Sequence, residues 1–567
     1  MTTIPPPPWL AFYDSVPPHL DYPALTLYEA LAASAARVPE HVAWDFFGRR
    51  SSYRELLREI DCAASVLAGL GLRAGDTLLA VMPTTPQAVI AFYAANRLGA
   101  RVAFIHPLST AIEITHYLDA TGAVMALTLD AFYPVLAAST PRRPLQTILL
   151  ARLGDYLPVI KRIGFWFKRG RHIAPIPADA RVQRWQEWMA TVAPATNAPV
   201  RAPDDVAAVL FSGGTTALPK GIELTNANFV AQGMQAASWV QIGGGDSMLA
   251  ILPVFHGFGL AVCVNAVLMA GGTSILVPQF SADIVAGLIR SVRPNFIVGV
   301  PTLYEALTRD PSLQRADLSC LKACYCGADT LPRAVKEKFE AMVAAGGGNA
   351  RLLEGYGLTE AVTGIMAMPA NHYREGSIGI PFPDMLAKIC VVGGSDELPP
   401  GTEGELCLSG PALMRGYLND PEATAQALRV HADGRTWLHT GDLASMDADG
   451  FFYFSVRLKR MIKSSGFNVY PAQVEAVLRE HPTVADACVI GVPDTSQMER
   501  VVAWVVTAAG VARTPETSEA LIAHCRERLI KWSCPRDIFF IDSLPTTKVG
   551  KIDYRALGDR LRQPEKA

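Results

Sequence analysis

A glycine-rich polar stretch follows an apolar, strand-like run within Val206–Asn226 (VAAVLFSGGTTALPKGIELTN). The adjacent Gly213 and Gly214 allow successive backbone N–H groups to face an anion without obstruction by side chains. Donors suited to phosphate come from Ser212, Thr215, Thr216 and Lys220. The spacing is not that of the Gly-x4-Gly-Lys-Ser/Thr loop of nucleotide hydrolases. On its own, the stretch therefore fits phosphate binding and a plain strand connection equally well.

Further segments that combine glycine with polar residues follow in order along the chain. They are Leu252–Phe258 (LPVFHGF), Gly327–Asp329 (GAD), Glu354–Glu360 (EGYGLTE), Trp437–Asp442 (WLHTGD), Arg457–Gly466 (RLKRMIKSSG) and Pro545–Lys551 (PTTKVGK). Together with the glycine-rich stretch they resemble the motifs of the adenylate-forming enzymes, which include acyl-CoA synthetases, firefly luciferase and nonribosomal-peptide adenylation domains. The resemblance covers essentially the whole chain and is closest to medium- and long-chain fatty acyl-CoA synthetases.

The resemblance implies an AMP-forming acid–thiol ligase. A carboxylate would attack the α-phosphate of ATP and release pyrophosphate, and the thiol of CoA would then attack the acyl-adenylate and release AMP. Because two anions must meet, such an enzyme has to neutralise charge and align its reactants. By resemblance, Thr215, Thr216 and Lys220 would hold the leaving phosphates. Thr359 would bind the α-phosphate, and Glu360 would bind Mg²⁺, which prefers oxygen ligands.

The resemblance also assigns residues to the nucleoside. Asp442 would accept hydrogen bonds from the ribose hydroxyls, Arg457 would approach the ribose, and Tyr356 would stack on adenine. The remaining nucleotide-binding candidates are Ser212, Gly327, Ala328, Asp329 and Gly357. Without the resemblance, Asp442 is typical of a turn or cap residue, and Thr359–Glu360 is typical of a helix N-terminus.

Lys551 is the candidate for the chemical step. By resemblance, its ammonium would bridge the carboxylate and the α-phosphate as charge develops. A small C-terminal domain would then rotate about a hinge at Lys459 and withdraw Lys551. The rotation would bring Lys463 and Gly466 to face the channel for the pantetheine arm of CoA.

Three positions depart from the family pattern. Ala217 stands where glycine is usual, Gly213 where serine or threonine is common, and Arg460 where aspartate is common. Ala217 adds one methyl group and removes no donor, so we expect it to stiffen the loop or slow the departure of pyrophosphate. We expect Arg460 to change the electrostatics of the hinge rather than to abolish activity.

The acid substrate is less constrained than the reaction. By resemblance, His256, a further catalytic candidate, and Phe258–Ala270 would line the acyl side of the pocket. The segment Ser465–Glu475 (SGFNVYPAQVE) resembles fatty acyl-CoA ligases most closely and favours medium to long chains. An aryl acid is the alternative.

Rival functions differ in what accepts the acyl group. An acyl-AMP ligase would load a carrier protein, but such ligases typically carry an insertion, and none is evident between Glu360 and Asp442. A β-lactone-forming member of the family would release AMP without CoA. A nucleotide-binding scaffold without catalysis would need no mobile lysine at position 551, and fold alone would not exclude it.

The fold expected from hydrophobic periodicity is α/β. Helical and strand-like segments alternate through the first two hundred residues, which predicts largely parallel, layered sheets. The resemblance implies a large layered N-terminal domain (1–456) and a small mobile α+β domain (457–567), with the hinge near 457–460. The apolar stretch 251–280 is broken by prolines, glycines and polar residues, so we expect a buried helix leading into a strand.

Composition excludes several classes of partner and compartment. The net charge of −2 gives no general attraction to nucleic acid or to anionic membranes. Residues 1–10 (MTTIPPPPWL) lack the pattern of a secretory signal, and the proline run predicts an extended surface arm. Ten scattered cysteines predict reduced, buried thiols in a cytoplasmic protein.

One local patch runs against the overall charge. Tyr156–Arg171 (YLPVIKRIGFWFKRGR) interleaves five basic residues with Phe165, Trp166 and Phe167. Basic residues around exposed aromatic side chains suit the surface of a membrane, which would place the enzyme peripherally on the inner membrane face. A surface loop whose aromatic side chains pack inward is the alternative, and the sequence favours it slightly.

Overall fold

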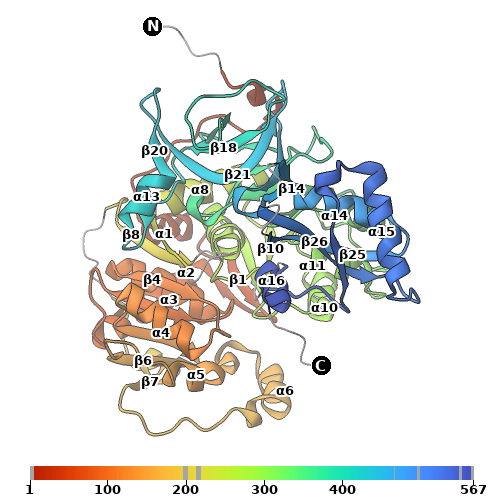
Figure 1. Cartoon of the computed structure of the whole chain (residues 1–567). Helices are drawn as coiled ribbons and strands as arrows, with labels where there is room; N and C mark the ends of the chain where they lie inside the picture. Colours follow the sequence, from red (N-terminus) through yellow and green to blue (C-terminus); the bar gives the residue numbers. More distant parts are fainter. Residues whose placement is uncertain are drawn as a thin grey trace. The chain divides into compact units, whose positions relative to one another are not determined.

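Helices and strands alternate along the computed structural model, as the periodicity predicts, and the α/β class is confirmed. The structure describes residues 6–195, 202–211, 219–464, 467–494, 498–547 and 552–562. The chain forms two structural units (Figure 1). The first holds Met1–Gly214, Leu218–Leu386 and Ser409–Leu438, and the second holds mainly Ala387–Leu408 and His439–Ala567. The predicted domain boundary between residues 456 and 457 stays a prediction.

An eight-stranded sheet in the first unit runs in the order β19-β9-β8-β4-β3-β5-β6-β7. Its strands are β3 (Thr77–Val81), β4 (Arg101–Ile105), β5 (Met125–Leu129), β6 (Thr147–Ala151), β7 (Val182–Arg184), β8 (Val206–Phe211), β9 (Gly221–Thr225) and β19 (Gly416–Tyr417). Helices α2 (Tyr53–Gly69), α3 (Pro86–Leu98) and α4 (Ala111–Thr121) alternate with them. Every residue of β3, β5 and β6 is buried, which is typical of a parallel sheet covered on both faces.

A nine-stranded sheet in the same unit runs in the order β16-β15-β14-β13-β12-β10-β11-β1-β2. Its strands are β1 (Val42–Phe46), β2 (Arg49–Ser52), β10 (Ser247–Ala250), β11 (Thr273–Leu276), β12 (Phe296–Gly299), β13 (Ala323–Cys326), β14 (Leu352–Gly357), β15 (Gly364–Ala367) and β16 (Ile380–Pro381). Strands β10, β12, β13 and β14 are parallel to one another, so their carboxyl ends share one edge of the sheet. Ligands of open α/β sheets bind at such edges.

Buried residues on three helices form the core beneath this second sheet. The helices are α10 (Ala282–Val292), α11 (Pro301–Thr308) and α12 (Arg333–Ala345). Cys324 and Cys326 of β13 belong to this core, and burial raises the pKa of both thiols well above the usual range. The ten cysteines are free thiols, as predicted.

Two smaller sheets contribute to the second unit. In one, β21 (Thr436–Met446) pairs with β18 (Gly404–Ser409) and with β22 (Phe452–Arg457). The other runs β24-β23-β26-β25, with β27 beside β26, and carries α14 (Pro471–Glu480), α15 (Pro515–Arg528) and α16 (Tyr554–Arg562). Its strands are β23 (Ile462–Ser464), β24 (Phe467–Val469), β25 (Val484–Asp494), β26 (Met498–Thr507) and β27 (Asp537–Phe540). Helices and strands thus occur together in this part of the chain, as the implied α+β character requires.

The most apolar stretch of the chain is buried rather than membrane-spanning in character. The stretch 251–280 forms the buried π-helix η5 (Phe258–Ala266), α9 (Val267–Ala270) and strand β11, as predicted. Within the described ranges, no helix is both long and apolar enough to cross a membrane. The extended backbone predicted for the proline run holds at Pro7, with φ −54° and ψ 137°, and ends at the 3₁₀ turn η1 (Pro8–Phe12). The turn buries Trp9, whose large apolar ring gains more from burial than from exposure on an arm.

The sequence favoured, for residues 156–171, a surface loop whose aromatic side chains pack inward, and this interpretation is wrong. Val159–Lys168 forms the helix α6, and none of its residues is fully buried. The side chains of Trp166 and Phe167 are more than half exposed, whereas Phe165 is only partly exposed. The alternation of basic and aromatic residues thus follows the turns of an exposed helix, and most of its aromatic rings do not pack inward.

Glu59 on α2 has a buried carboxylate oxygen. Burial raises the pKa of Glu59 to about 7, and its Oε2 has no hydrogen-bond partner among the described residues. The protonated form is therefore favoured in the folded chain, and its stabilising effect, present below the unfolded pKa near 4.5, is lost as the pH rises through 7. We expect Glu59→Gln to stabilise the protein by about 1–3 kcal/mol at pH 8 and hardly at all at pH 4.5.

Differential scanning fluorimetry at the two pH values would measure this effect as a shift of the unfolding midpoint. Glu403→Gln, at an exposed glutamate, is the matched control and should leave the midpoint unchanged at both pH values. Equal midpoints for Glu59→Gln and the unaltered chain at pH 8 would show that Glu59 ionises without penalty in the folded state.

Candidate functional site

Three of the sequence motifs lie at one edge of the nine-stranded sheet. Leu252–Gly257 follows β10, Gly327–Asp329 follows β13, and Leu358–Glu360 follows β14. Because these strands are parallel, the three motifs leave the sheet at the shared carboxyl edge. The topology therefore gathers motifs that are spread over residues 252–360 of the sequence.

Glycines at this edge allow the motifs to pack directly against one another. A Cβ at Gly257 would lie 2.0 Å from the carbonyl oxygen of Val362, and one at Gly357 would lie 2.0 Å from that of Thr363. A Cβ at Gly327 would lie 3.1 Å from the carbonyl oxygen of Gly355 and 3.2 Å from the ring of Phe258. These approaches exclude any side chain at the first two positions, because the blocking atoms belong to the backbone.

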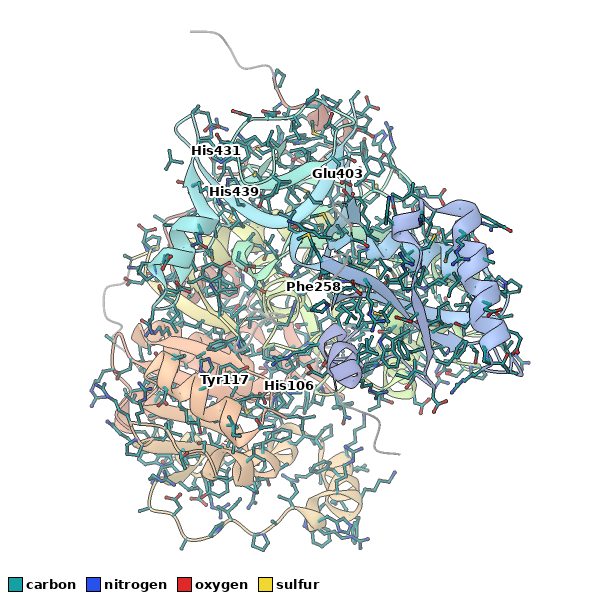
Figure 2. The ribbon with its side chains drawn as sticks, in the orientation of Figure 1. His106, Tyr117, Phe258, Glu403, His431 and His439 are labelled. Atoms are coloured by element: carbon teal, nitrogen blue, oxygen red, sulfur yellow. The ribbon has the colours of Figure 1, made fainter. Side chains whose placement is uncertain are left out.

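His256 lies in the loop that precedes the π-helix η5. The Phe258 N–H donates to its Nδ1 at 3.2 Å, which leaves Nε2 to carry the proton of the neutral ring. The preceding residue, Phe255, packs against His106 with ring centroids 4.5 Å apart. His106, which Figure 2 labels, follows β4, so this contact joins a loop of one large sheet to a loop of the other. A π-helical segment directly after the histidine is typical of functional sites.

A tyrosine that the sequence did not single out connects two of the predicted site residues. The hydroxyl of Tyr417 donates to Oε1 of Glu360 at 3.0 Å. The ammonium of Lys220 lies 5.0 Å from the centre of the Tyr417 ring and 3.1 Å from Oδ2 of Asp420. Tyr417 therefore links Lys220, which follows the glycine-rich stretch, to Glu360, the predicted magnesium ligand.

Asp420 contributes an anion beside this lysine. The N–H of Ala423 and the ammonium of Lys220 lower the pKa of its carboxyl group, which is therefore charged at neutral pH. The Glu360 backbone is held as well, because the N–H of Met414 donates to its carbonyl oxygen at 2.8 Å. Neither Tyr417 nor Asp420 carried a sequence signal, since GYLND is typical of an ordinary turn before a helix.

Asp442 does not occupy a turn or a cap, so the interpretation without the family resemblance is wrong. It lies within β21 opposite Arg457 of β22, and Nε of Arg457 is 3.2 Å from its Oδ1. Asp442 is only 1% exposed, whereas Arg457 is largely exposed. A buried carboxylate beside an exposed guanidinium can accept hydrogen bonds from a hydroxylated ligand at the surface.

A buried network holds the residues directly before Asp442. Glu405 accepts a hydrogen bond from the N–H of Gly441 at 3.1 Å, and it lies 3.0 Å from Nδ1 of His439 (Figure 2 labels His439). Cys407 Sγ lies 3.7 Å from the same nitrogen. Gly441 has a φ of +69°, a conformation that favours glycine, and Glu405 fixes it. Glu405 was not identified from the sequence, because an isolated glutamate in a strand carries no signal.

The predicted hinge segment contains an arginine with several partners. Arg460 lies 2.8 Å from the hydroxyl of Tyr554 and 3.2 Å from Oε1 of Glu475, and its guanidinium stacks 3.5 Å from the centre of the Tyr554 ring. The departure from aspartate at position 460 is therefore accommodated by specific contacts. Lys463 is exposed, and its N–H donates to Glu499 at 2.7 Å.

The remaining predicted residues divide into described and undescribed positions. Tyr356 is half-buried on β14, Thr359 starts a single 3₁₀ turn, Ala328 has a left-handed φ of +71°, and Asp329 is exposed. Outside the described residues lie Ser212, Gly213, Gly214, Thr215, Thr216, Ala217, Gly466 and Lys551, as does the side chain of Lys459.

Two known protein families together match most of the chain. The family described as AMP-binding enzyme matches residues 31–418, and the family described as AMP-binding enzyme C-terminal domain matches residues 473–551. A long-chain-fatty-acid–CoA ligase of Bacillus subtilis is 35% identical, with 97% of each chain covered. A long-chain-fatty-acid–CoA ligase of Escherichia coli is 32% identical, with 95% of each covered. A feruloyl-CoA synthase of Amycolatopsis is 32% identical over 89% of this chain and 93% of its own.

Two solved structures have folds similar to that of this chain. A fatty acyl CoA synthetase of Mycobacterium tuberculosis is 26% identical with a TM-score of 0.72, covering 94% of this chain and 98% of that one. An ATP-bound RpMatB–BxBclM chimera is 25% identical with a TM-score of 0.81, covering 96% of this chain and all of that one.

Proposed function

Because the chain belongs to the AMP-binding enzyme family, we propose that it is an ATP-dependent fatty acid:CoA ligase acting on medium- to long-chain acids. It forms an acyl-adenylate with release of pyrophosphate, and then an acyl-CoA thioester with release of AMP. The observation that carries the proposal is the cluster of Lys220, Tyr417 and Glu360. This cluster places a cation and a carboxylate together, as a site for a polyphosphate with its metal ion requires.

The residues around Glu360 fit Mg²⁺. One carboxylate oxygen accepts from Tyr417, which orients the group, and Mg²⁺ is commonly held by one or two carboxylates together with phosphate oxygens of the substrate. When bound, the ion would offset negative charge on the phosphates of ATP. Lys220 would add a second positive charge, which Asp420 holds in place until the phosphates replace it as a partner.

The residues that resemble the family's nucleotide motifs would bind the nucleoside. Asp442 would accept from the ribose hydroxyls while Arg457 fixes its carboxylate. Glu405 would act as a positioning residue, because it holds Gly441 directly before Asp442. Tyr356 would stack on adenine, with Gly327, Ala328, Asp329 and Gly357 providing backbone near the base. His256 would border the acyl group, next to the buried segment Phe258–Ala270.

The substrate and acceptor can be tested together. We expect AMP release from ATP and Mg²⁺ only when both CoA and a medium- or long-chain fatty acid are present, measured against short-chain and aryl acids. AMP release that requires a phosphopantetheine-bearing carrier protein in place of CoA would contradict CoA as the acceptor. Absence of ATP–pyrophosphate exchange with every acid would contradict the ligase assignment itself.

A further inference from the structure

The helix α6 has an exposed apolar face that the ligase reaction does not use. At about 100° per residue, the side chains of one face lie within an arc of about 120°. They are Val159, Ile160, Ile163, Trp166 and Phe167. Each is more than half exposed, and Ile160 is 85% exposed. Most exposed apolar residues occur singly in a protein, whereas these five share one face of one helix.

The opposite side of α6 attaches the helix to the first unit. Phe165, the least exposed of its aromatic residues, projects to this side. The Lys161 ammonium donates to the carbonyl oxygen of Phe47 at 2.8 Å and lies 5.9 Å from the centre of the Phe47 ring. Figure 1 shows α6 at the margin of its unit, beyond β7 and α5 (Tyr133–Ala137). The helix is therefore anchored on one side and open to its surroundings on the other.

The charge around α6 is uniformly positive. Five basic residues and no acidic residue lie between Asp155 and Asp179, namely Lys161, Arg162, Lys168, Arg169 and Arg171. Within the described part of the chain, none of the five forms an ion pair. Because the whole chain has a net charge of −2, this concentration of positive charge is local.

We propose that α6 is an interfacial anchor that docks this protein on an anionic lipid bilayer. The apolar face would enter the boundary between headgroups and acyl chains, while the basic residues other than Lys161, which is held by Phe47, face the anionic headgroups. Each basic residue near the surface contributes about 1 kcal/mol of attraction, which explains the preference for a charged bilayer over another apolar partner. The role of the anchor in collecting bilayer-dissolved fatty acid rests on the proposed function, but docking itself does not.

Vesicle flotation without ATP, acid or CoA tests the docking separately from catalysis. We expect the protein to float with vesicles of phosphatidylcholine and phosphatidylglycerol, but not with phosphatidylcholine alone. Trp166→Ser with Phe167→Ser should weaken binding at least tenfold, as should Lys168→Glu with Arg169→Glu. Ile112→Ser with Val430→Ser removes apolar residues that are even more exposed elsewhere and should leave binding unchanged.

A second measurement locates the contact within the helix. Brominated lipids should quench tryptophan fluorescence in the unaltered protein, and Trp166→Phe should retain binding but lose most of the quenching. Unchanged flotation of both double variants would overturn the proposal. Concentration-dependent self-association that requires Trp166 and Phe167, without vesicle binding, would also overturn it, because the face would then be an interface between copies. Activity of every variant towards a medium-chain acid supplied in vesicle-free solution should equal that of the unaltered chain.

Discussion

Glu360→Gln should reduce acyl-adenylate formation by about a thousandfold while leaving the fold intact. The substitution keeps the size of the side chain and an acceptor for the Tyr417 hydroxyl, but it removes the negative charge that would hold Mg²⁺. ATP–pyrophosphate exchange measures the loss, and the Mg²⁺ concentration for half-maximal exchange should rise. Exchange at the normal rate and the normal Mg²⁺ requirement would show that Glu360 is not the metal ligand.

Tyr417→Phe separates orientation from charge at the same carboxylate. It removes one hydrogen bond to Glu360 and retains the ring beside Lys220, so the expected loss is about fivefold to tenfold. The Mg²⁺ requirement should rise only slightly, because the carboxylate keeps its charge. A loss as large as that of Glu360→Gln would mean that Tyr417 contacts the reacting groups directly.

Much of this site could be predicted from the sequence, because apolar strands and the glycines that follow them can be recognised from a few neighbouring residues. The strands around residues 77–82, 124–129 and 206–211 are continuous apolar runs, which are typical of buried parallel strands. Parallel order then places Gly257, Gly327 and Gly357 at one edge, where backbone approaches of 2.0–3.1 Å explain why glycine stands at these positions.

The residues that the sequence did not reveal act through contacts across long sequence distances. Tyr417 meets Glu360 because β19 pairs with β9. Glu405 reaches Gly441 because β18 lies beside β21. Neither pairing has a local signature, since strand partners are selected by tertiary packing. The same limit explains the interpretation of Asp442 as a turn residue, because HTGD has turn-forming residues yet lies within a strand.

The sequence left open, for a different reason, whether the aromatic side chains near Trp166 pack inward or are exposed. Periodicity in ten residues identifies an amphipathic face, but it does not say whether that face meets the protein or its surroundings. The exposed fraction of Trp166 decides between these alternatives. Composition alone favoured burial, because large aromatic side chains are usually covered.

Lys551→Ala should lower acyl-adenylate formation by about a hundredfold to a thousandfold, as expected for removing one charged donor from a developing negative charge. Residues 548–551, which include Lys551, lie outside the described residues, whereas Thr547 and Ile552 on either side lie within them. Ile552 bridges Thr546, and the N–H of Asp553 donates to the carbonyl oxygen of Pro545 at 2.8 Å, so the base of the segment is closed. Supplying preformed acyl-adenylate and CoA bypasses the first step, and the variant should then form acyl-CoA at the normal rate.

Lys463→Ala should give the converse pattern and serves as the matched control for Lys551→Ala. Lys463 is exposed on β23, and its side chain has no partner within the described part of the chain. We expect normal ATP–pyrophosphate exchange and a roughly tenfold slower conversion of acyl-adenylate to acyl-CoA, because loss of one contact to CoA costs about 1.4 kcal/mol. If both variants slowed both half-reactions equally, the two lysines would not act in separate steps. The alternation between two arrangements of the C-terminal domain would then lose its support, since that alternation requires each lysine to serve one step only.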